Sequence, residues 1–241
     1  MRSLLTPKWV LSHLFVAFMV VFMAGLGLWQ LDRLDQRKVD NDEIRTASEA
    51  AARPVEELLG DPEVLDHTSV TVTGIYRDDL SFLVANRTFD SQPGSWLATP
   101  VELDDGRLVV VGRGWVPRRW VAGEDPRTIA TPTGAVTVTG RLFASVDGGR
   151  IGEGSAALPE VSRIDLDTVA ELLDTDVAGR WVQLERQDPP RGDLPVPVPP
   201  PLLDDGPHLS YAFQWFFFST ATVIAYVLIL RRRLREVPDG E

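Results

Sequence analysis

Two long apolar runs lie near the ends of the chain, at residues 10–29 and 211–230. Only Ser12 and His13 are polar in the first run, and the second contains no charged side chain. Twenty helical residues rise about 30 Å, which is the thickness of the hydrocarbon core of a bilayer. The pattern therefore predicts two transmembrane helices, over residues 10–29 and 208–230.

Two other interpretations of these runs are weaker. A cleaved signal peptide would have a shorter apolar run, and no small-residue cleavage site precedes the charged stretch "LDRLDQRK" at 31–38. A buried core helix is disfavoured for the second run by its length and by the arginines at 231–233 and 235 that follow it. We therefore expect an uncleaved anchor and a second span.

The arginine cluster behind the second run sets the predicted orientation, because basic residues close to a span stay in the cytoplasm. Two spans then place residues 1–9 and 231–241 in the cytoplasm and residues 30–207 outside. Arg33 and Arg37 oppose this orientation mildly, since they follow the first span. The sequence thus predicts a multi-pass protein of the cell (plasma) membrane with an extracytoplasmic central domain.

The first helix is expected to continue past the membrane as a helical stalk over residues 30–53. Charged residues alternate there with apolar ones, and no Gly or Pro occurs before Pro54. We expect Arg37 to be a solvated residue of this stalk. A frayed linker beyond Lys38 is the alternative.

From residue 68 the hydrophobic pattern changes to a period of two. Val, Thr and aromatic residues recur in six segments separated by turn residues: 69–76, 81–86, 96–103, 107–116, 135–144 and 180–186. Such segments are typical of strands, and "LDDGRL" at 103–108 predicts a tight hairpin between two of them. The repeated "VTVTG" at 70–74 and 136–140 indicates either two equivalent edge or corner strands with a glycine bend or a chance likeness.

A short helix and a proline-rich segment complete the central part. "DLDTVAELLD" at 165–174 predicts a helix with Asp165 or Asp167 as its N-cap. Residues 189–207 are rich in proline, which predicts an extended connector back to the membrane. The predicted fold is an α+β membrane protein: two transmembrane helices flank an extracytoplasmic antiparallel β-sheet or small open barrel with one short helix, over residues 54–188.

The composition of the chain excludes several classes of function. The chain has no cysteine, which excludes disulfides and thiolate metal sites, and its net charge of −11 speaks against nucleic-acid binding. Phosphate-loop, dinucleotide-binding and zinc-protease motifs are missing, and His67 is the only histidine of the central domain. We therefore expect no catalytic residues and no enzymatic activity, and we expect His67 to be a loop residue without a role.

Two groups of residues are candidates for binding. Arg113 and Trp115 lie two apart on a predicted strand, so they share a face and can stack to present a cation; alternatively, Trp115 is core and the arginine is solvated. His208, Tyr211 and Trp215 lie on one face at the start of the second helix, where the helix dipole disfavours a charged imidazole. A neutral imidazole binds metals. Alternatively, His208 is a bystander at the membrane interface.

Three motifs follow one another along the chain: "LGLWQLDRL" at 26–34, "VVVGRGWVPR" at 109–118 and "GPHLSYAFQWF" at 206–216. Together with the order span, domain, span, they resemble the surfeit locus protein 1 family of cytochrome oxidase assembly factors. The first motif resembles that family's signature at Gly27, Trp29, Gln30 and Arg33, and the last matches its final helix at His208, Tyr211 and Trp215. The segment before the short helix departs from the family pattern, since it lacks an Asn and a Trp often found there.

The resemblance implies an assembly factor for a haem–copper (cytochrome c) oxidase, which helps to deliver or retain haem a for the catalytic subunit. It implies His208 as a transient ligand of the haem iron. The further haem-binding candidates are Tyr211, Trp215 and Arg33, and the partner or structural candidates are Gly27, Trp29, Gln30, Arg113 and Trp115. Implied partners are the membrane, the catalytic subunit of cytochrome c oxidase and the haem a synthesis machinery. The alternative is a permanently bound accessory subunit of the oxidase that binds no haem.

Overall fold

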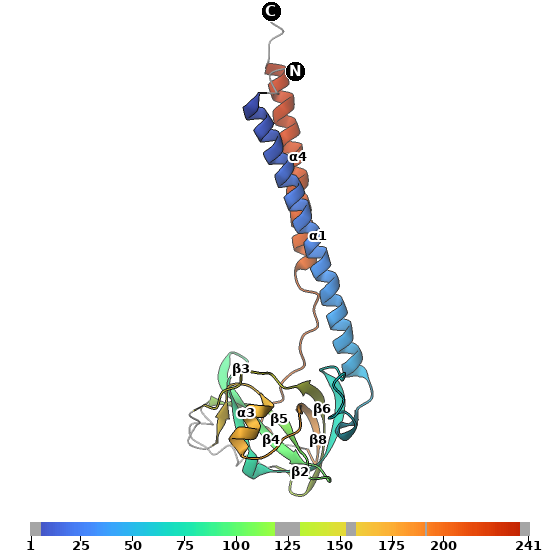
Figure 1. The fold of residues 1–241 in the computed structure, drawn as a ribbon, viewed down its shortest axis with the longest axis vertical. Coiled ribbons are helices and arrows are strands. Elements are labelled where there is room, and N and C mark those ends of the chain that lie inside the picture. The colour runs from blue at the N-terminus through green and yellow to red at the C-terminus, as the bar shows by residue number, and fades with distance from the viewer. Residues whose placement is uncertain (1–5, 119–130, 153–157, 191, 237–241) are drawn as a thin grey trace, which may run out of the picture. The chain divides into compact units, whose positions relative to one another are not determined.

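The computed structural model describes residues 6–118, 131–152, 158–190 and 192–236 of the chain. Its backbone divides into two units, one made of Met1–Asp42 with Leu202–Glu241 and the other of Glu43–Pro201. The helical unit contains α4 (His208–Glu236) and most of α1 (Pro7–Glu49), and the second unit contains the β-strands and α3 (Leu166–Leu173) (Figure 1). The helix α1 therefore continues without a break well beyond residue 29, as expected for the stalk.

The two long helices run antiparallel and contact each other along their length (Figure 1). The hydroxyl of Ser219 on α4 donates to the carbonyl of Val20 on α1 (3.1 Å), and the hydroxyl of Tyr226 lies 2.6 Å from Nδ1 of His13. Five residues of α1 that contact α4 or are buried recur every seven positions: His13, Val20, Gly27, Leu34 and Asn41. A seven-residue repeat keeps one face of a helix toward its partner, as in a coiled coil.

The outer faces of both helices carry large apolar side chains that are open to the surroundings. Phe15, Phe22, Phe213 and Phe217 are each more than half exposed. By length and composition both helices can cross a membrane. The 43 residues of α1 rise about 64 Å, which is roughly twice the hydrocarbon core, so part of this helix extends beyond a bilayer that it crosses.

Eight strands of the described chain form a mixed sheet in the order β1-β2-β6-β8-β5-β4-β3-β7. They are β1 (Arg53–Pro54), β2 (Thr68–Tyr76), β3 (Phe82–Phe89), β4 (Gln92–Glu102), β5 (Leu108–Pro117), β6 (Ala135–Ala144), β7 (Glu160–Val161) and β8 (Arg180–Asp188). All six segments predicted from the period of two form strands. The strand β2 also pairs with β4, so that β2, β6, β8, β5 and β4 form a closed ring of pairings, as in a small barrel.

The prediction of an antiparallel sheet is wrong in one respect. The strand β5 pairs in parallel with β8, as do β1 with β2 and β3 with β7, so the sheet is mixed. β6, β7 and α3 lie between β5 and β8 in the chain, and a connection of this length allows the two strands to run in the same direction. The alternation within a strand indicates its faces but not the direction of a distant neighbour.

The core lies on both sides of β5, whose residues are all buried. Val109 and Val111 pack into one hydrophobic cluster with Val72 and Val138, whereas Val110 packs into a second cluster beneath α3. This burial on two faces explains the continuous apolar run in "VVVGRGWV". The helix α3 closes the second cluster with Leu166 and Val169, and the side chain of Asp165 accepts a bond from the amide of Thr168, which confirms Asp165 as the N-cap.

The two "VTVTG" copies lie side by side as the antiparallel pair β2 and β6. Val72 lies opposite Val138, and each glycine lies opposite the first valine of the other copy. A Cβ on Gly74 would lie 2.1 Å from the carbonyl oxygen of Glu102 on β4, and one on Gly140 would lie 2.2 Å from that of Gln183 on β8. The two copies therefore occupy equivalent corners, where only glycine lets the next strand approach so closely.

Candidate functional site

His208 is the first residue of α4, and its ring is held by the other helix. Its Nδ1 lies 2.8 Å from Oε1 of Gln30 on α1. Because a carbonyl oxygen only accepts, this hydrogen bond requires a proton on Nδ1, and in the neutral imidazole the lone pair is then on Nε2. Imidazoles that bind a metal are usually oriented by such a bond at the other ring nitrogen. The contact is therefore compatible with the tautomer that a metal ligand requires.

The close approach of the two helices brings Gln30 to His208. Gly27 lies one turn before Gln30, is buried, and would place a Cβ 2.7 Å from Cε1 of Phe216. The Phe216 ring thus occupies the space that any other residue at position 27 would fill. Small residues at a helix interface allow such an approach in membranes. Gly27 and Gln30 of the signature motif therefore act together in positioning His208.

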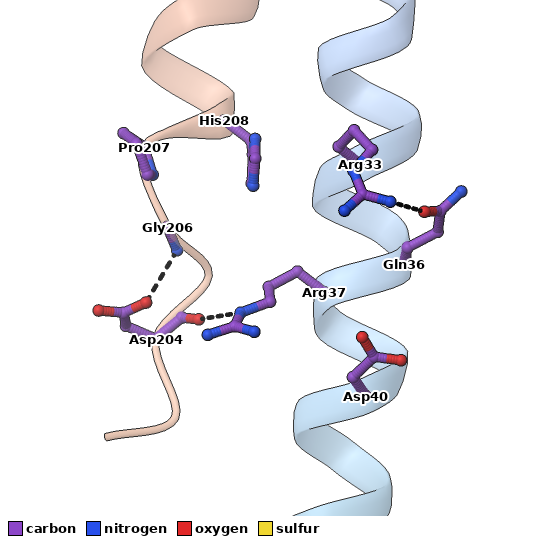
Figure 2. Close-up of a pocket in the computed structure, with 8 residues that line it drawn as sticks. All are labelled: Arg33, Gln36, Arg37, Asp40, Asp204, Gly206, Pro207 and His208. Carbon is purple, nitrogen blue, oxygen red and sulfur yellow. Dashed lines mark hydrogen bonds between the residues drawn. The ribbon is translucent and has the colours of Figure 1, made fainter. Parts of the chain in front are cut away.

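A polar pocket of about 330 Å³ opens beside His208. It is lined by Arg33, Gln36, Arg37 and Asp40 of α1 and by Asp204, Gly206, Pro207 and His208 of the α4 side. Figure 2 shows the imidazole reaching from the first turn of α4 toward the side of α1 that carries the two arginines. Two arginines, two aspartates and one histidine thus lie around one cavity.

The arginines of this pocket are held by hydrogen bonds along and across α1. Nη1 of Arg33 donates to Oε1 of Gln36 (2.5 Å), and Nε2 of Gln36 donates to a carboxylate oxygen of Asp32 (2.8 Å). Nε of Arg37 lies 3.4 Å from the carbonyl oxygen of Asp204, to which the buried Asn41 also donates (2.9 Å). The segment that leads into α4 is therefore tied to α1, and Arg37 is not the purely solvated stalk residue that we expected.

The structure brings together only part of the predicted set. Gln30, Arg33 and His208 lie at one place, whereas the side chains of Trp29 and Tyr211 are 53% and 47% exposed. Trp215 is half-buried and contacts the ring of Phe218. The face of α1 that meets α4 is thus the face of Gly27 and Gln30.

Sequence reasoning did not identify five residues of this site: Gln36, Arg37, Asp40 and Asp204, which line the pocket, and Asn41, which donates to Asp204. Arg37 follows Gln30 by seven residues, and Asn41 follows Leu34 by seven. The repeat along α1 was therefore the signal that could have identified Arg37 and Asn41. Asp204 carried no such signal, since it contributes its backbone carbonyl.

Arg113 and Trp115 lie in the β-rich unit and do not form the stacked pair that was one of our two interpretations. Trp115 is buried, as the alternative interpretation had it, but Arg113 is not solvated. The register of β5 against β4 shifts at Arg113, since Gly112 faces Ala98 and Gly114 faces Leu97. This bulge adds one residue and breaks the period of two on which the prediction rested. Arg113 is 2% exposed and its Cζ lies 5.2 Å from the centre of the Tyr76 ring, so it presents no cation to the solvent.

Trp115 fastens the proline-rich connector to the sheet. Its backbone exchanges two hydrogen bonds with Val196, at 2.7 and 2.8 Å, and its indole Nε1 donates to the carbonyl of Arg87 (3.0 Å). Gly114 has a φ of +139°, and a Cβ there would lie 2.3 Å from the carbonyl oxygen of Val196. The Arg-Gly-Trp motif is therefore a docking point for the connector.

His67 packs against the sheet. It has a φ of 69°, and its ring meets the ring of Phe143 edge-on at 4.7 Å. Burial lowers the pKa of His67, and the charge of Arg141 lowers it further. Its role in the structure is that of a packed neutral ring.

Comparison with known proteins agrees with the three motifs. A sequence model of the SURF1 family matches residues 17–220. An uncharacterized SURF1-like protein of Mycobacterium tuberculosis is 31% identical over 242 residues, which cover 95% of this chain and 88% of that protein. SURF1-like proteins of Rickettsia bellii (25% over 230 residues, 91% of each chain) and Monosiga brevicollis (28% over 229 residues, 86% and 83%) also match. These matches span both helices and the β-rich unit, and with them the chain belongs to the SURF1 family.

Proposed function

We propose that this protein is a membrane-anchored assembly factor for a haem–copper oxidase, and that it holds haem a for the catalytic subunit at His208. The SURF1 family is known for oxidase assembly factors. One observation carries the haem proposal: Nδ1 of His208 is engaged by Gln30, beside a pocket that holds two arginines.

The residues around His208 fit such a group. When bound, haem a would supply an iron that accepts an imidazole nitrogen and propionates that need cationic partners. Nε2 of His208 is the nitrogen left for the iron, because Nδ1 is engaged by Gln30. Arg33 and Arg37 retain guanidinium donors at the rim for carboxylates, in addition to those used by Gln36 and Asp204. A single histidine would hold the group without enclosing it, which suits transfer to a partner.

The membrane arrangement is part of the same proposal. Residues 10–29 of α1 and 208–230 of α4 cross the plasma membrane, with residues 1–9 and 231–241 in the cytoplasm and residues 30–207 outside. The length of the two helices, their exposed apolar faces and the arginine cluster after residue 230 support it. The pocket beside His208 then lies at the outer membrane interface, where an apolar macrocycle stays in lipid and its carboxylates reach water.

The test is the absorption spectrum of the full-length protein purified from cells with and without haem a synthesis. The wild type should carry a haem a spectrum only in the first case, and His208→Ala should lose the spectrum while the protein stays inserted. The oxidase made beside His208→Ala should contain less haem a. The matched control is His67→Asn, which should change neither. Full haem occupancy in His208→Ala would exclude the ligand role.

Purification of the mature oxidase distinguishes an assembly factor from an accessory subunit. An assembly factor should be missing from mature oxidase purified in mild detergent. A stoichiometric amount of this chain in the mature oxidase would instead show that it is a permanent subunit.

A further inference from the structure

A second pocket, of about 380 Å³, lies entirely within the β-rich unit. It is lined by Arg87, Trp96, Val146, Ser162, Arg163, Ile164 and Trp181. Its walls come from β3, β4 and β8, from the segment that follows β6, and from the segment between β7 and α3. Its volume lies at the lower end of the range of about 300–1,000 Å³ that is usual for small-molecule sites. The pocket therefore has room for a small ligand.

The Arg87 guanidinium lines this pocket and is held in place by two neighbours. Cζ of Arg87 lies 4.6 Å from the centre of the Trp96 ring, and Nη1 donates to the carbonyl of Ala85 (3.1 Å). Nε is buried and finds no hydrogen-bond partner among the residues that the structure describes. Nη2 also donates to no residue that the structure describes, and it is not buried, so it is the donor that a ligand in the pocket can reach. Arg87 is thus oriented by its neighbours and still has this donor to offer.

Arg163 adds a second cation to the same pocket. Its Nη1 donates to the backbone carbonyl of Asp147 (3.2 Å), and in the described part of the chain neither Arg163 nor Arg87 forms an ion pair with a carboxylate. The neighbouring carboxylate of Asp165 is engaged by the amides of Gly149 and Thr168. Burial, followed by the charge of Arg163, lowers the pKa of Arg87. Two like charges at one cavity favour a bound anion.

Apart from Ser162, whose hydroxyl accepts from the amide of Arg150 (3.1 Å), the rest of the pocket is apolar. Val146, Ile164 and the rings of Trp96 and Trp181 form its walls, and Nε1 of Trp181 is already used by the carbonyl of Ala144 (3.1 Å). A free phosphate would leave several oxygens against these walls without a donor, which is unfavourable. A carboxylate on an apolar or aromatic body matches both parts of the cavity, the two guanidinium groups and the indole faces.

We propose that this pocket binds a small-molecule carboxylate, with its charged group between Arg87 and Arg163 and its apolar body against Trp96 and Trp181. The site lies in a different unit of the chain from the His208 pocket and uses none of its residues. It is therefore a second ligand site, and it does not depend on the haem proposal.

The experiment measures binding of 4-(trifluoromethyl)benzoate to the full-length protein in lipid nanodiscs by fluorine NMR, with empty nanodiscs as the blank. The benzoate should bind saturably, and the matched neutral amide, 4-(trifluoromethyl)benzamide, should bind at least about tenfold more weakly. Arg163→Gln should weaken benzoate binding about tenfold or more. Arg186→Gln removes an exposed arginine of β8 that does not line the pocket and should leave binding unchanged.

Arg87→Gln should weaken binding at least as much as Arg163→Gln, but it also removes the contact with Trp96. The Arg163→Gln variant, whose side chain is exposed, therefore decides the test. Equal binding of the benzoate and the amide would overturn the proposal, as would an equal loss in Arg163→Gln and Arg186→Gln. Inorganic phosphate that competes as well as the benzoate would show that the apolar walls select nothing, and would also overturn it.

Discussion

The hydrogen bond between Gln30 and His208 allows the haem proposal to be tested without removing the proposed ligand. In Gln30→Leu the side chain keeps a similar volume but loses the oxygen that lies 2.8 Å from Nδ1 of His208. The imidazole is then free to rotate and to exchange its proton between the two nitrogens. We expect a loss of haem binding in a protein whose ligand is intact.

The expected loss of haem affinity follows from the role of the Gln30–His208 hydrogen bond, which orients the ligand. Removing the partner that orients a metal-bound histidine lowers metal affinity about 10- to 100-fold, which corresponds to about 1.4–2.7 kcal/mol. The same bond contributes only about 0.5–1.5 kcal/mol to the association of the two helices. Gln30→Leu should therefore remain inserted and folded while its affinity for haem falls.

The assay is a titration of the full-length protein in nanodiscs with ferric haem b, followed by the Soret absorbance. Gln30→Glu keeps an oxygen that accepts from Nδ1, so it should bind haem at least as well as the wild type. Gln36→Leu alters a residue that lines the pocket but bonds to Arg33, so its affinity should fall by less than about threefold. Unchanged affinity in Gln30→Leu, or an equal loss in Gln30→Glu, would refute the positioning role.

Three further predictions concern the rest of the chain. Reporters that are active only outside the cytoplasm should give a signal when fused at Gly94 and none at Glu241, and the reverse result would contradict the proposed orientation. Gly114→Ala should lower the free energy of unfolding of the β-rich unit by about 3 kcal/mol in denaturant titrations, because its φ is +139° and the new Cβ meets a connector carbonyl at 2.3 Å. His67 has a lowered pKa in the folded protein, so folding stability should fall as the pH drops below about 6.5 toward the folded-state pKa. Thermal melting between pH 7.5 and 5.5 should show a smaller loss in His67→Asn, which removes the imidazole and tolerates a positive φ; equal slopes would exclude this cause.

The strands, the hairpin at 103–108 and the cap of α3 were predictable because each depends on residues close in sequence. The amide of Gly106 donates to Leu103 and that of Leu103 to Arg107, within one short turn. The parallel pairing of β5 with β8 was not predictable, because it joins Val111 to Val182 across a long connection. Local alternation contains no information on such a pair.

The error at Arg113 has a similar origin. A period of two assigns Arg113 and Trp115 to one face only if the strand is regular, and the bulge opposite Leu97 and Ala98 removes that condition. At the His208 pocket, the motifs led to Gln30, Arg33 and His208, but the tie through the carbonyl of Asp204 involves no side chain of that residue. A contact made by a backbone carbonyl leaves no pattern in the sequence.

The helix pair contains two histidines, and their surroundings predict which of them binds haem. His13 lies near the N-terminal end of α1. The hydroxyl of Tyr226 is 2.6 Å from its Nδ1, and the centre of the Trp9 ring is 6.1 Å from the centre of its own ring. Both imidazoles are thus engaged at Nδ1 by a neighbouring side chain, but only His208 lines the pocket of Arg33 and Arg37. Propionates need cations, so His13→Phe should keep the haem a spectrum that His208→Phe loses. Since Phe fills a similar volume at both positions, loss of the spectrum in His13→Phe and its retention in His208→Phe would move the site to the other end of the helix pair.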